Sequence, residues 1–320
     1  MKVLTIGNGF VAEHLPYEIA HGRVAADSRY VDFLLGQYKP DVIINCIGKT
    51  GRPNVDWCEK HKEEVAVANT AIPLLLAEGC AKRGVRMINI GSGCIYFGES
   101  PNFHYVQGDG SPMPEPIKTY SLGDPNYEPF WGKAFTQYFT MVFPAKKIED
   151  GWRETDFANP QSYYSKSKYA CDLMLGQMPH VTTLRIRMPV TDRDVPRNLI
   201  NKLRGYKQVI DIPNSMTFMS DLVRCVDWAV NNDTSGIYHV ANPQPVTAAQ
   251  IMREFQKYVP EHSFEYITER QLDEMTLAKR SNCILSTEKL RLAGFQMTDS
   301  VEALTECMAK YVKNMRRNNV

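Results

Sequence analysis

Short apolar runs alternate with longer amphipathic stretches through the first half of the chain. The apolar runs are KVLTIG, DVIINCIG, VRMINIGSG and VTTLRIRMPV, and the stretches between them include FVAEHLPYEIA, VAVANTAIPLLLAEGCAKRG and SKSKYACDLMLGQM. Strands that alternate with helices pair in parallel, because each helix carries the chain back to the start of the next strand. The sequence therefore predicts an α/β fold, a Rossmann-like doubly wound parallel sheet covered by helices.

The regular alternation ends near Pro189, which divides the chain into two expected parts. Residues 1–189 are expected to form the Rossmann domain, and residues 190–320 are expected to be mainly a smaller substrate-binding lobe at the carboxyl ends of the strands. Within the second part, residues 218–242 contain the helical stretch SDLVRCVDWAVNN and the strand-like run GIYHVAN. We expect this segment to return to the Rossmann domain.

A segment at about residues 99–150 interrupts the pattern. It is rich in Pro, Gly and aromatic residues, has no clear period, and is far longer than an ordinary loop. Its aromatic side chains are expected to be buried against the body of the subunit, against a partner subunit, or over the substrate as a lid, in that order of preference. They are Phe103, Tyr105, Tyr120, Tyr127, Phe130, Trp131, Phe135, Tyr138, Phe139 and Phe143.

Charge and cysteine usage exclude several classes of protein. The chain has 37 Lys and Arg against 36 Asp and Glu, a net charge of +1, which lacks the basic excess expected for nucleic-acid binding. No long uninterrupted apolar run indicates a membrane span, and the N-terminus reads directly as a strand, so we expect a cytoplasmic protein. The eight cysteines contain no CxxC pair and the seven histidines are dispersed, so no metal site is expected.

The turn after the first strand has the pattern G-x-G-x-x-A, formed by Gly7, Gly9 and Ala12. Glycines there let the backbone approach a pyrophosphate, and a following helix N-terminus offers amide donors. The pattern alone is weak, but its position beside the first strand favours a dinucleotide. Near the expected end of the second strand, Arg23 favours a 2′-phosphate and hence NADPH, while Asp27 keeps NADH as an alternative.

The segment SYYSKSK carries the strongest chemical signal. It places Tyr164 and Lys168 four residues apart, hence on one face of a helix. A phenol can give a proton to a carbonyl that is being reduced if an ammonium and a hydroxyl stabilise its phenolate. Ser92, at the end of the run INIGS, supplies a suitable hydroxyl. The three residues together favour nucleotide-dependent carbonyl chemistry.

These features resemble the extended short-chain dehydrogenase/reductase family, and within it the nucleotide-rhamnose branch. That branch contains the UDP-4-keto-6-deoxyglucose 3,5-epimerase/4-reductases, also found as the C-terminal part of plant rhamnose synthases, and is related to dTDP-4-dehydrorhamnose reductase. The resemblance rests on TGRPNVDWCE, YSKSK, TLRIRMPV, PRNLINK, IPNSMT and KRSN, which follow the family's order from Thr50 to Asn282.

The resemblance implies an activity and a set of catalytic residues. The expected enzyme inverts C3 and C5 of UDP-4-keto-6-deoxy-D-glucose and then reduces C4 with NADPH, which gives UDP-L-rhamnose. Cys94 and Lys202 match the family's epimerase acid and base. Tyr164, Lys168 and Ser92 match its reductase residues. It also implies a homodimer through the Tyr164 helix.

The resemblance further implies binding residues. Arg280 is the best placed for the diphosphate, while Arg185 and Arg187 share one side of a strand, so one of them is left as a structural ion-pair partner. In the turn TGRPNVDWCE, Arg52 and Asn54 are preferred as ligand contacts, although Trp57 could pack and Asp56 could cap a helix. The expected cofactor residues are Gly7, Gly9, Phe10, Val11, Arg23, Cys46, Gly48, Asn69, Tyr164 and Lys168. The expected substrate residues are Arg52, Asn54, Arg187, Pro189, Arg197, Asn198, Arg280 and Asn282.

Two departures from the family leave alternatives open. The glycine loop is one residue shorter than the usual G-x-x-G-x-x-G and ends in Ala12, and the segment from Tyr96 to Tyr164 is unusually long. One alternative is a plain reductase of a UDP- or dTDP-linked 4-ketosugar. Another is a non-catalytic NADP-binding subunit that regulates a second enzyme.

Overall fold

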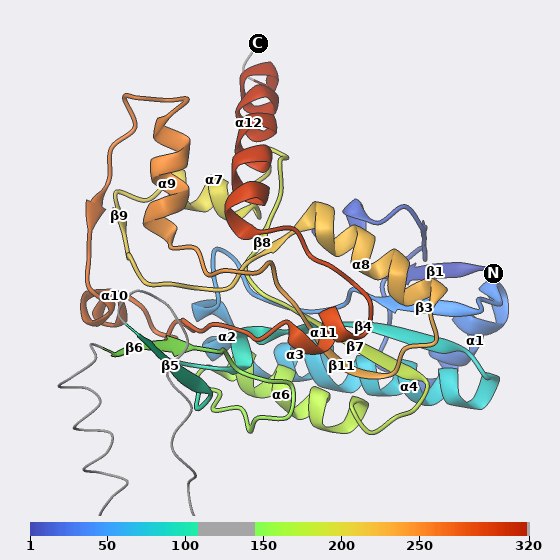
Figure 1. Ribbon diagram of the computed structural model, residues 1–320. Coiled ribbons are helices and arrows are strands. Elements are labelled where there is room, and N and C mark those ends of the chain that lie inside the picture. The colour runs from blue at the N-terminus through green and yellow to red at the C-terminus, as the bar shows by residue number, and fades with distance from the viewer. Residues whose placement is uncertain (108–144, 319–320) are drawn as a thin grey trace, which may run out of the picture.

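A computed structural model describes residues 1–107 and 145–318, and its centre is a six-stranded sheet (Figure 1). All the strands of this sheet run parallel, in the order β11-β7-β4-β3-β1-β2, so the predicted α/β fold class is confirmed. Helices cover both faces of the sheet, so all four residues of the strand VIIN are buried. This is why apolar and polar residues do not alternate along it. The strands are β1 (Val3–Ile6), β2 (Glu18–Ile19), β3 (Val42–Asn45), β4 (Arg86–Ser92), β7 (Val181–Ile186) and β11 (Gly236–Val240).

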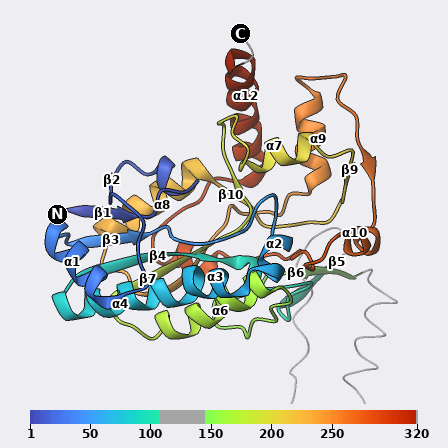
Figure 2. The same ribbon diagram turned by 180° about the vertical axis from the view of Figure 1, so that it is seen from behind.

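Helices cover the two faces of the sheet, as Figures 1 and 2 show from opposite sides. One face packs against α1 (Ser28–Tyr38), α4 (Ile72–Arg83) and α6 (Tyr163–Leu175), which bury leucine, valine and cysteine side chains there. The other face packs against α8 (Met219–Asn231) and α11 (Glu288–Leu292). The segment 218–242 therefore lies with the sheet, and so does α11 from further along the chain.

The helix expected in FVAEHLPYEIA is wrong. The structure has only a three-residue 3-10 helix, Ala12–His14, followed by β2. Pro16 explains the difference, because it cannot donate a backbone hydrogen bond and disfavours helical geometry in the residue before it. Leu15 is accordingly extended, with φ −82° and ψ 141°. The true helix on this side is α1, which begins after Asp27 and which the periodicity did not reveal.

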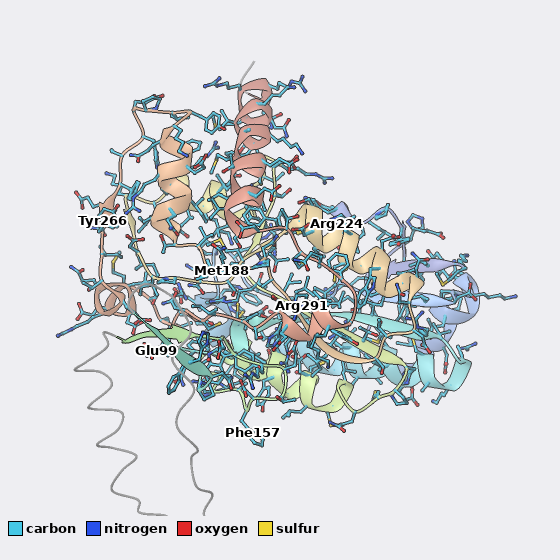
Figure 3. All side chains as sticks on the ribbon, viewed as in Figure 1. Glu99, Phe157, Met188, Arg224, Tyr266 and Arg291 are labelled. Atoms are coloured by element: carbon cyan, nitrogen blue, oxygen red, sulfur yellow. The ribbon has the colours of Figure 1, made fainter. Side chains whose placement is uncertain are left out.

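The smaller lobe stands beyond the carboxyl ends of the strands and has its own core. Buried side chains of Phe255, Met308 and Tyr311 join α9 to α12. Figure 3 shows Met188 between the lobe and the sheet, and Tyr266 at the outer edge of the lobe. Its elements are β8 (Pro189–Val190), α7 (Leu199–Arg204), β9 (Gln208–Val209), β10 (Thr217–Phe218), α9 (Ala248–Gln256), β12 (Glu265–Tyr266), α10 (Glu269–Met275) and α12 (Ser300–Asn318).

One helical run in the described residues, Lys62–Arg83, is long and apolar enough to cross a membrane by length and composition. It comprises α3 (Lys62–Ala66), a π-helical turn (Val67–Ala71) and α4. Half of its apolar window is buried, and Leu76 and Ala77 pack in the core beneath the sheet. This packing explains the apolar composition of the run.

The long aromatic segment starts and ends on a two-stranded antiparallel ribbon, β5 (Phe103–Gln107) with β6 (Ala145–Glu149). The ribbon brings the two ends of the segment together at one edge of the molecule. The side chain of Phe103 is 45% exposed. The aromatic residues from Tyr120 to Phe143, and the predicted burial of their rings, lie outside the described residues.

Candidate active site

The candidate site lies at the carboxyl ends of β1, β3, β4 and β7, where parallel α/β sheets bind ligands. Gly7 follows β1 with φ +101°, and a Cβ there would lie 3.2 Å from the backbone carbon of Cys46 and the side chain of Ile47. The first predicted glycine is therefore required both by its backbone angle and by the close approach of the chain that follows β3. At Gly9 a Cβ would meet open space.

Ser92, Tyr164 and Lys168 meet at the end of β4. Tyr164 is buried on the first turn of α6, and the Ser92 hydroxyl lies close enough to its phenol to act on the pKa of that phenol. Burial raises the pKa of Tyr164 more than the Ser92 hydroxyl lowers it, so the phenol keeps its proton at neutral pH. One turn later, Lys168 is buried too, and its ammonium donates to the Ile90 carbonyl at 3.4 Å, while burial lowers its pKa. The structure thus assembles the three residues that the sequence grouped.

Asn69 clamps the chain after β3 onto α6. Its amide oxygen accepts from the Lys49 N–H at 2.7 Å, and its amide nitrogen donates to the Lys49 carbonyl at 3.0 Å and to the Ser167 hydroxyl at 3.1 Å. A Cβ on Gly48 would lie 3.2 Å from the Lys168 ammonium. Gly48 and Asn69 therefore lie beside the lysine, whereas Cys46 is half-buried and burial raises the pKa of its thiol to about 12.

Arg23 is exposed beyond β2, and its charge reaches Glu64 on α3. The pKa of Glu64 is lowered first by a hydrogen bond from Lys49 and, more weakly, by the charges of neighbours that include Arg23. Asp27 is engaged elsewhere, since it caps α1 by accepting from the Arg29 N–H at 2.9 Å. This arrangement leaves Arg23 as the basic residue at the end of β2.

His14 joins the glycine loop to the smaller lobe, a role that the sequence did not indicate. Its ring nitrogens lie 2.7 Å from the Phe10 carbonyl and 2.9 Å from the Thr191 hydroxyl, and its ring packs edge-on against Phe10 at 5.0 Å. Val11, the N-cap residue of the 3-10 helix, and Phe10 are half-buried beside it. Burial lowers the pKa of His14, so its neutral form is favoured at this junction.

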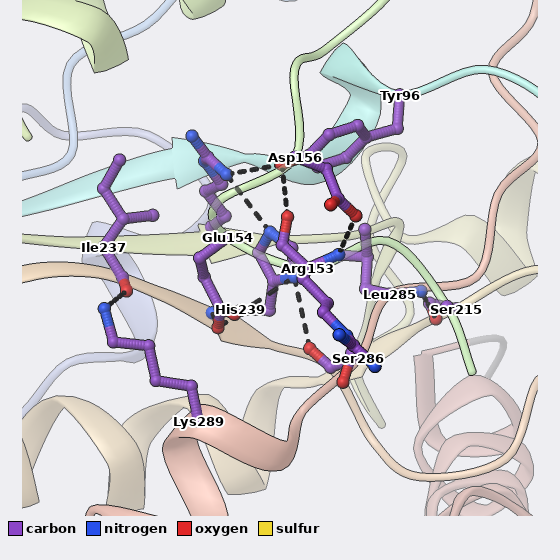
Figure 4. A network of polar contacts seen from close by, with 12 residues as sticks. Tyr96, Arg153, Glu154, Asp156, Ser215, Ile237, His239, Leu285, Ser286 and Lys289 are labelled. Atoms are coloured by element: carbon purple, nitrogen blue, oxygen red, sulfur yellow. Dashed lines mark hydrogen bonds and ion pairs between the residues drawn. The ribbon is translucent and has the colours of Figure 1, made fainter. Parts of the chain in front are cut away.

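The structure distinguishes the two arginines that the sequence left open. Arg185 is the structural partner: its Nε donates to Asp172 on α6 at 2.8 Å, and both side chains are at most 3% exposed. Arg185 also donates to the Tyr96 hydroxyl at 2.8 Å and lies 3.2 Å from His239. Figure 4 shows how this network extends through His239 and Glu154 towards Ser286.

Asp172→Asn is expected to destabilise the fold by about 3–5 kcal/mol, because it leaves the buried charge of Arg185 without its counter-charge. Urea unfolding followed by far-UV circular dichroism measures the loss. Glu288→Gln is the control, since its pair with Arg291 at 3.9 Å is more than half exposed. A loss for Asp172→Asn as small as that of the control would show that the pair does not hold α6 to β7.

Cys94 and Lys202 carry the epimerase prediction. Cys94 lies in the 3-10 helix Gly93–Ile95 directly after β4, its N–H donates to the Ser92 hydroxyl at 3.2 Å, and its carbonyl accepts from Ser165 at 2.6 Å. Lys202 lies on α7 in the smaller lobe, where burial and then the charge of Arg197 lower its pKa. Cys94 is therefore fixed against the reductase residues, whereas Lys202 comes from the facing lobe.

The turn TGRPNVDWCE contacts the smaller lobe. Asp56, at the start of α2 (Asp56–Lys60), accepts from both terminal nitrogens of Arg280 at 2.7 and 3.1 Å and from the Ala278 N–H at 2.8 Å. Thr50 accepts from Arg197 at 3.2 Å. Two arginines predicted to bind the substrate thus reach across to this turn.

The remaining residues of the turn have structural contacts. Asn54 accepts from the Asp56 N–H at 2.9 Å. The N-cap position of α2 is Val55, which makes no side-chain cap bond, so Asp56 is the first residue of the helix and not its cap. Trp57 stacks on His61 at 3.8 Å, and Arg52 is exposed. The expectation that Trp57 packs is met, and Arg52 stays a predicted ligand contact.

Asp56→Asn is expected to lower the free energy of unfolding by about 1 kcal/mol at neutral pH, since the pair with Arg280 is about a quarter exposed. Burial alone would raise the pKa of Asp56, but the bonds from Arg280 and Ala278 outweigh it, so the pKa lies below its usual value. The contribution is therefore complete above about pH 4, the ordinary aspartate value, and is lost as the pH falls through the lower folded value. Urea titrations at several pH values measure this.

The matched control for Asp56 is Asp32→Asn, in an exposed pair with Arg83. Its effect should be close to zero at every pH. An Asp56→Asn deficit that stayed the same from neutral to acid pH would contradict an ionised pair.

Three further predicted substrate residues occupy structural positions. Asn198 caps α7, and its fully buried amide bonds the backbone of Thr191, Arg193 and Ile200. Asn282 bonds Asn214 and Glu269, and Pro189 pairs in β8 with β10. The amide of Asn198 is fully engaged, so its role in the structure is to hold the loop before α7. Within residues 1–107 and 145–318, no cluster of His, Cys, Asp and Glu is arranged to hold a metal ion.

Comparison with known proteins agrees with this geometry. The model of the NAD dependent epimerase/dehydratase family matches residues 7–122. A bifunctional dTDP-4-dehydrorhamnose 3,5-epimerase/dTDP-4-dehydrorhamnose reductase of Arabidopsis thaliana is 31% identical over 296 residues, which cover 92% of this chain and 84% of that protein. A trifunctional UDP-glucose 4,6-dehydratase/UDP-4-keto-6-deoxy-D-glucose 3,5-epimerase/UDP-4-keto-L-rhamnose-reductase of the same plant is 31% identical over 87% of this chain, which spans only 35% of that longer protein.

Solved structures show the same fold. The UDP-rhamnose synthase of Acanthamoeba polyphaga mimivirus superposes with a TM-score of 0.75 at 26% identity, over 97% of this chain and 99% of that one. The dTDP-4-dehydrorhamnose reductase of Bacillus anthracis, solved in complex with NADP, superposes with a TM-score of 0.71 at 18% identity, over 97% of this chain and 99% of that one. With its parallel sheet and its Ser92, Tyr164 and Lys168 cluster, the chain is therefore an enzyme that belongs to the extended short-chain dehydrogenase/reductase family, in the group of NAD-dependent epimerases and dehydratases.

Proposed function

We propose that the protein is a bifunctional 3,5-epimerase/4-reductase that converts UDP-4-keto-6-deoxy-D-glucose to UDP-L-rhamnose with NADPH. The observation that carries the proposal is the meeting of two sets of groups at one strand end. Ser92 lies beside the Tyr164 phenol, and Cys94 follows two residues later, with its N–H donating to the same Ser92 hydroxyl. The relatives of this protein that have a known activity epimerise and reduce nucleotide-linked 4-keto-6-deoxy sugars. Their activities support the same two steps, epimerisation and reduction, for this protein.

The residues at the ends of β1 and β3 fit a dinucleotide. Gly7 leaves no room for a side chain beside Cys46, and Gly48 lies beside the Lys168 ammonium, as a backbone cradle for phosphate and ribose requires. Gly7 and Gly9 would hold the pyrophosphate, and Lys168 the nicotinamide ribose. NADPH supplies a hydride when it is bound, and the exposed Arg23 supports NADPH over NADH.

The reduction needs a proton on the sugar oxygen. Tyr164 holds that proton, because burial raises the pKa of its phenol, and Ser92 fixes the direction of the phenol. After the transfer, the Lys168 ammonium stabilises the phenolate across one helical turn. The protein thus supplies an oriented acid in a buried site, where charges interact strongly.

The two inversions need a base and an acid on opposite faces of the sugar. Protons on C3 and C5 are acidic because the enolate spreads its charge onto the C4 oxygen. Cys94 lies at the end of β4 and Lys202 on α7 of the smaller lobe, so a sugar bound between sheet and lobe would meet them on opposite faces. Burial and Arg197 lower the pKa of Lys202, which brings its proton exchange closer to neutral pH.

Incubation of the enzyme with NADPH and either UDP- or dTDP-linked 4-keto-6-deoxyglucose tests the proposal. We expect oxidation of NADPH and a product with the L-rhamno configuration by NMR, faster with the UDP sugar. A product that keeps the D-configuration at C5 would leave a plain reductase. Tight NADPH binding with no turnover of any ketosugar would leave a regulatory subunit.

A further inference from the structure

Arg187 is a fully buried arginine whose partners do not neutralise its charge. One terminal nitrogen donates to the Cys94 sulfur at 2.8 Å, and the other donates to the Asn214 amide oxygen at 2.5 Å and to the Ser281 carbonyl. Its Nε is buried and has no hydrogen-bond partner in the described part of the chain. The guanidinium is therefore held rigidly, with one of its terminal nitrogens directed at the Cys94 sulfur.

A second buried arginine, on β7 itself, shows what is missing. Arg185, two residues earlier, pairs with the carboxylate of Asp172. Among residues 1–107 and 145–318, no carboxylate lies within ion-pair distance of Arg187. An arginine keeps its charge when buried, and an uncompensated buried charge is costly. Two cysteine sulfurs, those of Cys94 and Cys283, interact with the Arg187 charge. Burial raises the pKa of Cys283, so the Cys94 sulfur, in contact at 2.8 Å, is the partner that we expect to become an anion.

Some groups around Cys94 favour its thiolate form and others oppose it. Arg187 reaches it from the end of β7, and a guanidinium beside a cysteine favours the thiolate. Tyr164 on α6 and Cys283 in the segment after α10 also lie near the Cys94 sulfur. Either of them would oppose a Cys94 thiolate if it were itself ionised. Burial of Tyr164 and Cys283 raises the pKa of each, so both stay neutral near pH 7 and Arg187 is the charged neighbour that remains.

Gly93 makes this contact sterically possible. A Cβ at Gly93 would lie 3.5 Å from the Arg187 Cδ and 2.5 Å from the Leu285 side chain. Because Gly93 has no side chain, the 3-10 helix that carries Cys94 can pack directly against Arg187. The sequence G-S-G-C thus presents the sulfur to the guanidinium.

We propose that Arg187 is a positioning residue that holds Cys94 as a thiolate, ready to accept a proton from the carbon beside the ketone. The inference rests on the proposed epimerase role of Cys94 and goes beyond it, because it assigns the arginine to the sulfur rather than to the sugar diphosphate. The thiolate accepts the proton and becomes a thiol, while the electron pair of the broken C–H bond forms the enolate. No other reactant is needed.

Alkylation of Cys94 by iodoacetamide, measured by peptide mass spectrometry across a range of pH without substrate, tests the proposal. The thiolate reacts and the thiol does not. In the wild type we expect the half-maximal rate at or below neutral pH. Arg187→Met should move this midpoint upward by about one to three pH units. Arg187→Lys keeps the charge but loses the planar set of N–H donors, so it should move the midpoint upward by less.

Arg193→Met is the matched control. It removes an exposed guanidinium, which donates to the Glu13 carbonyl. No hydrogen bond joins Arg193 to Cys94 in the described residues. Its alkylation midpoint should equal that of the wild type. Thermal melting checks that each variant folds.

Two results would overturn the proposal. One is a wild-type midpoint near pH 8.5, the ordinary value for a cysteine, and this result needs no variant to fold. The other is a folded Arg187→Met protein with an unchanged midpoint. Failure of the proposed function looks different, because the wild type would then show the low alkylation midpoint but would exchange no sugar protons with solvent.

Discussion

Tyr164→Phe is expected to slow reduction of the 4-ketosugar by about 10²–10⁴-fold, because the ring stays in place but the proton donor is lost. Stopped-flow absorbance of NADPH with saturating ketosugar measures this step. Exchange of the C3 and C5 protons with solvent should continue in the variant, since Cys94 and Lys202 are untouched. The variant thus separates the two activities that share the site.

The neighbouring tyrosine provides the control. Tyr163 lies on the same first turn of α6, but it is half-buried, its N–H bonds Glu59, and Lys62 lies 5.6 Å from its ring centre. Tyr163→Phe should reduce the ketosugar at nearly the wild-type rate. Equal losses in the two variants would mean that the helix, and not the Tyr164 phenol, had been disturbed.

Cys94→Ala and Lys202→Met are each expected to lower exchange of the sugar carbon protons by about 10²–10⁴-fold. A ketosugar that is already epimerised should still be reduced at close to the wild-type rate, because Ser92 and Tyr164 remain. Mass spectrometry of the sugar nucleotide in heavy water measures exchange, and NADPH absorbance measures reduction. This pattern is the opposite of that expected for Tyr164→Phe, and it is the signature of two catalytic sets in one site.

Controls of the same residue types lie away from the cleft groups. Cys307→Ala removes a half-buried thiol from α12, and Lys207→Met removes an exposed ammonium after α7. Neither should change exchange or reduction. If Cys94→Ala exchanged protons normally, the base would have to be another group and the account of Arg187 would fall with it.

The sequence predicted the elements with strong periodicity. β4, α6 and β7 follow from apolar runs and helical spacing. These three elements place Ser92, Tyr164 and Arg185, and Arg187 comes directly after β7. A four-residue spacing fixes Tyr164 and Lys168 on one helix face regardless of the rest of the fold. This is why the pairing of Tyr164 with Lys168 could be predicted from one segment.

Contacts between distant segments could not be read in this way. Asp56 and Arg280 are 224 residues apart, and no local pattern indicates that they form a pair. Arg185 lies on β7 and Arg187 follows directly after the strand, with the same side-chain parity. Only the packing of α6 and of the segment around Ser281 shows which arginine meets a carboxylate and which meets a sulfur. The mistaken helix over FVAEHLPYEIA had a local cause that Pro16 could have signalled.

The count of solvent deuterons in the product tests the central claim most directly. The enzyme is incubated with UDP-4-keto-6-deoxyglucose and NADPH in heavy water, and the carbon-bound deuterium of the purified sugar nucleotide is measured by mass spectrometry and located by NMR. The account predicts NADPH oxidation with two deuterons, one on C3 and one on C5. NADPH oxidation with no carbon-bound deuterium would contradict it, and would leave a reductase in which Cys94 and Lys202 have no catalytic part.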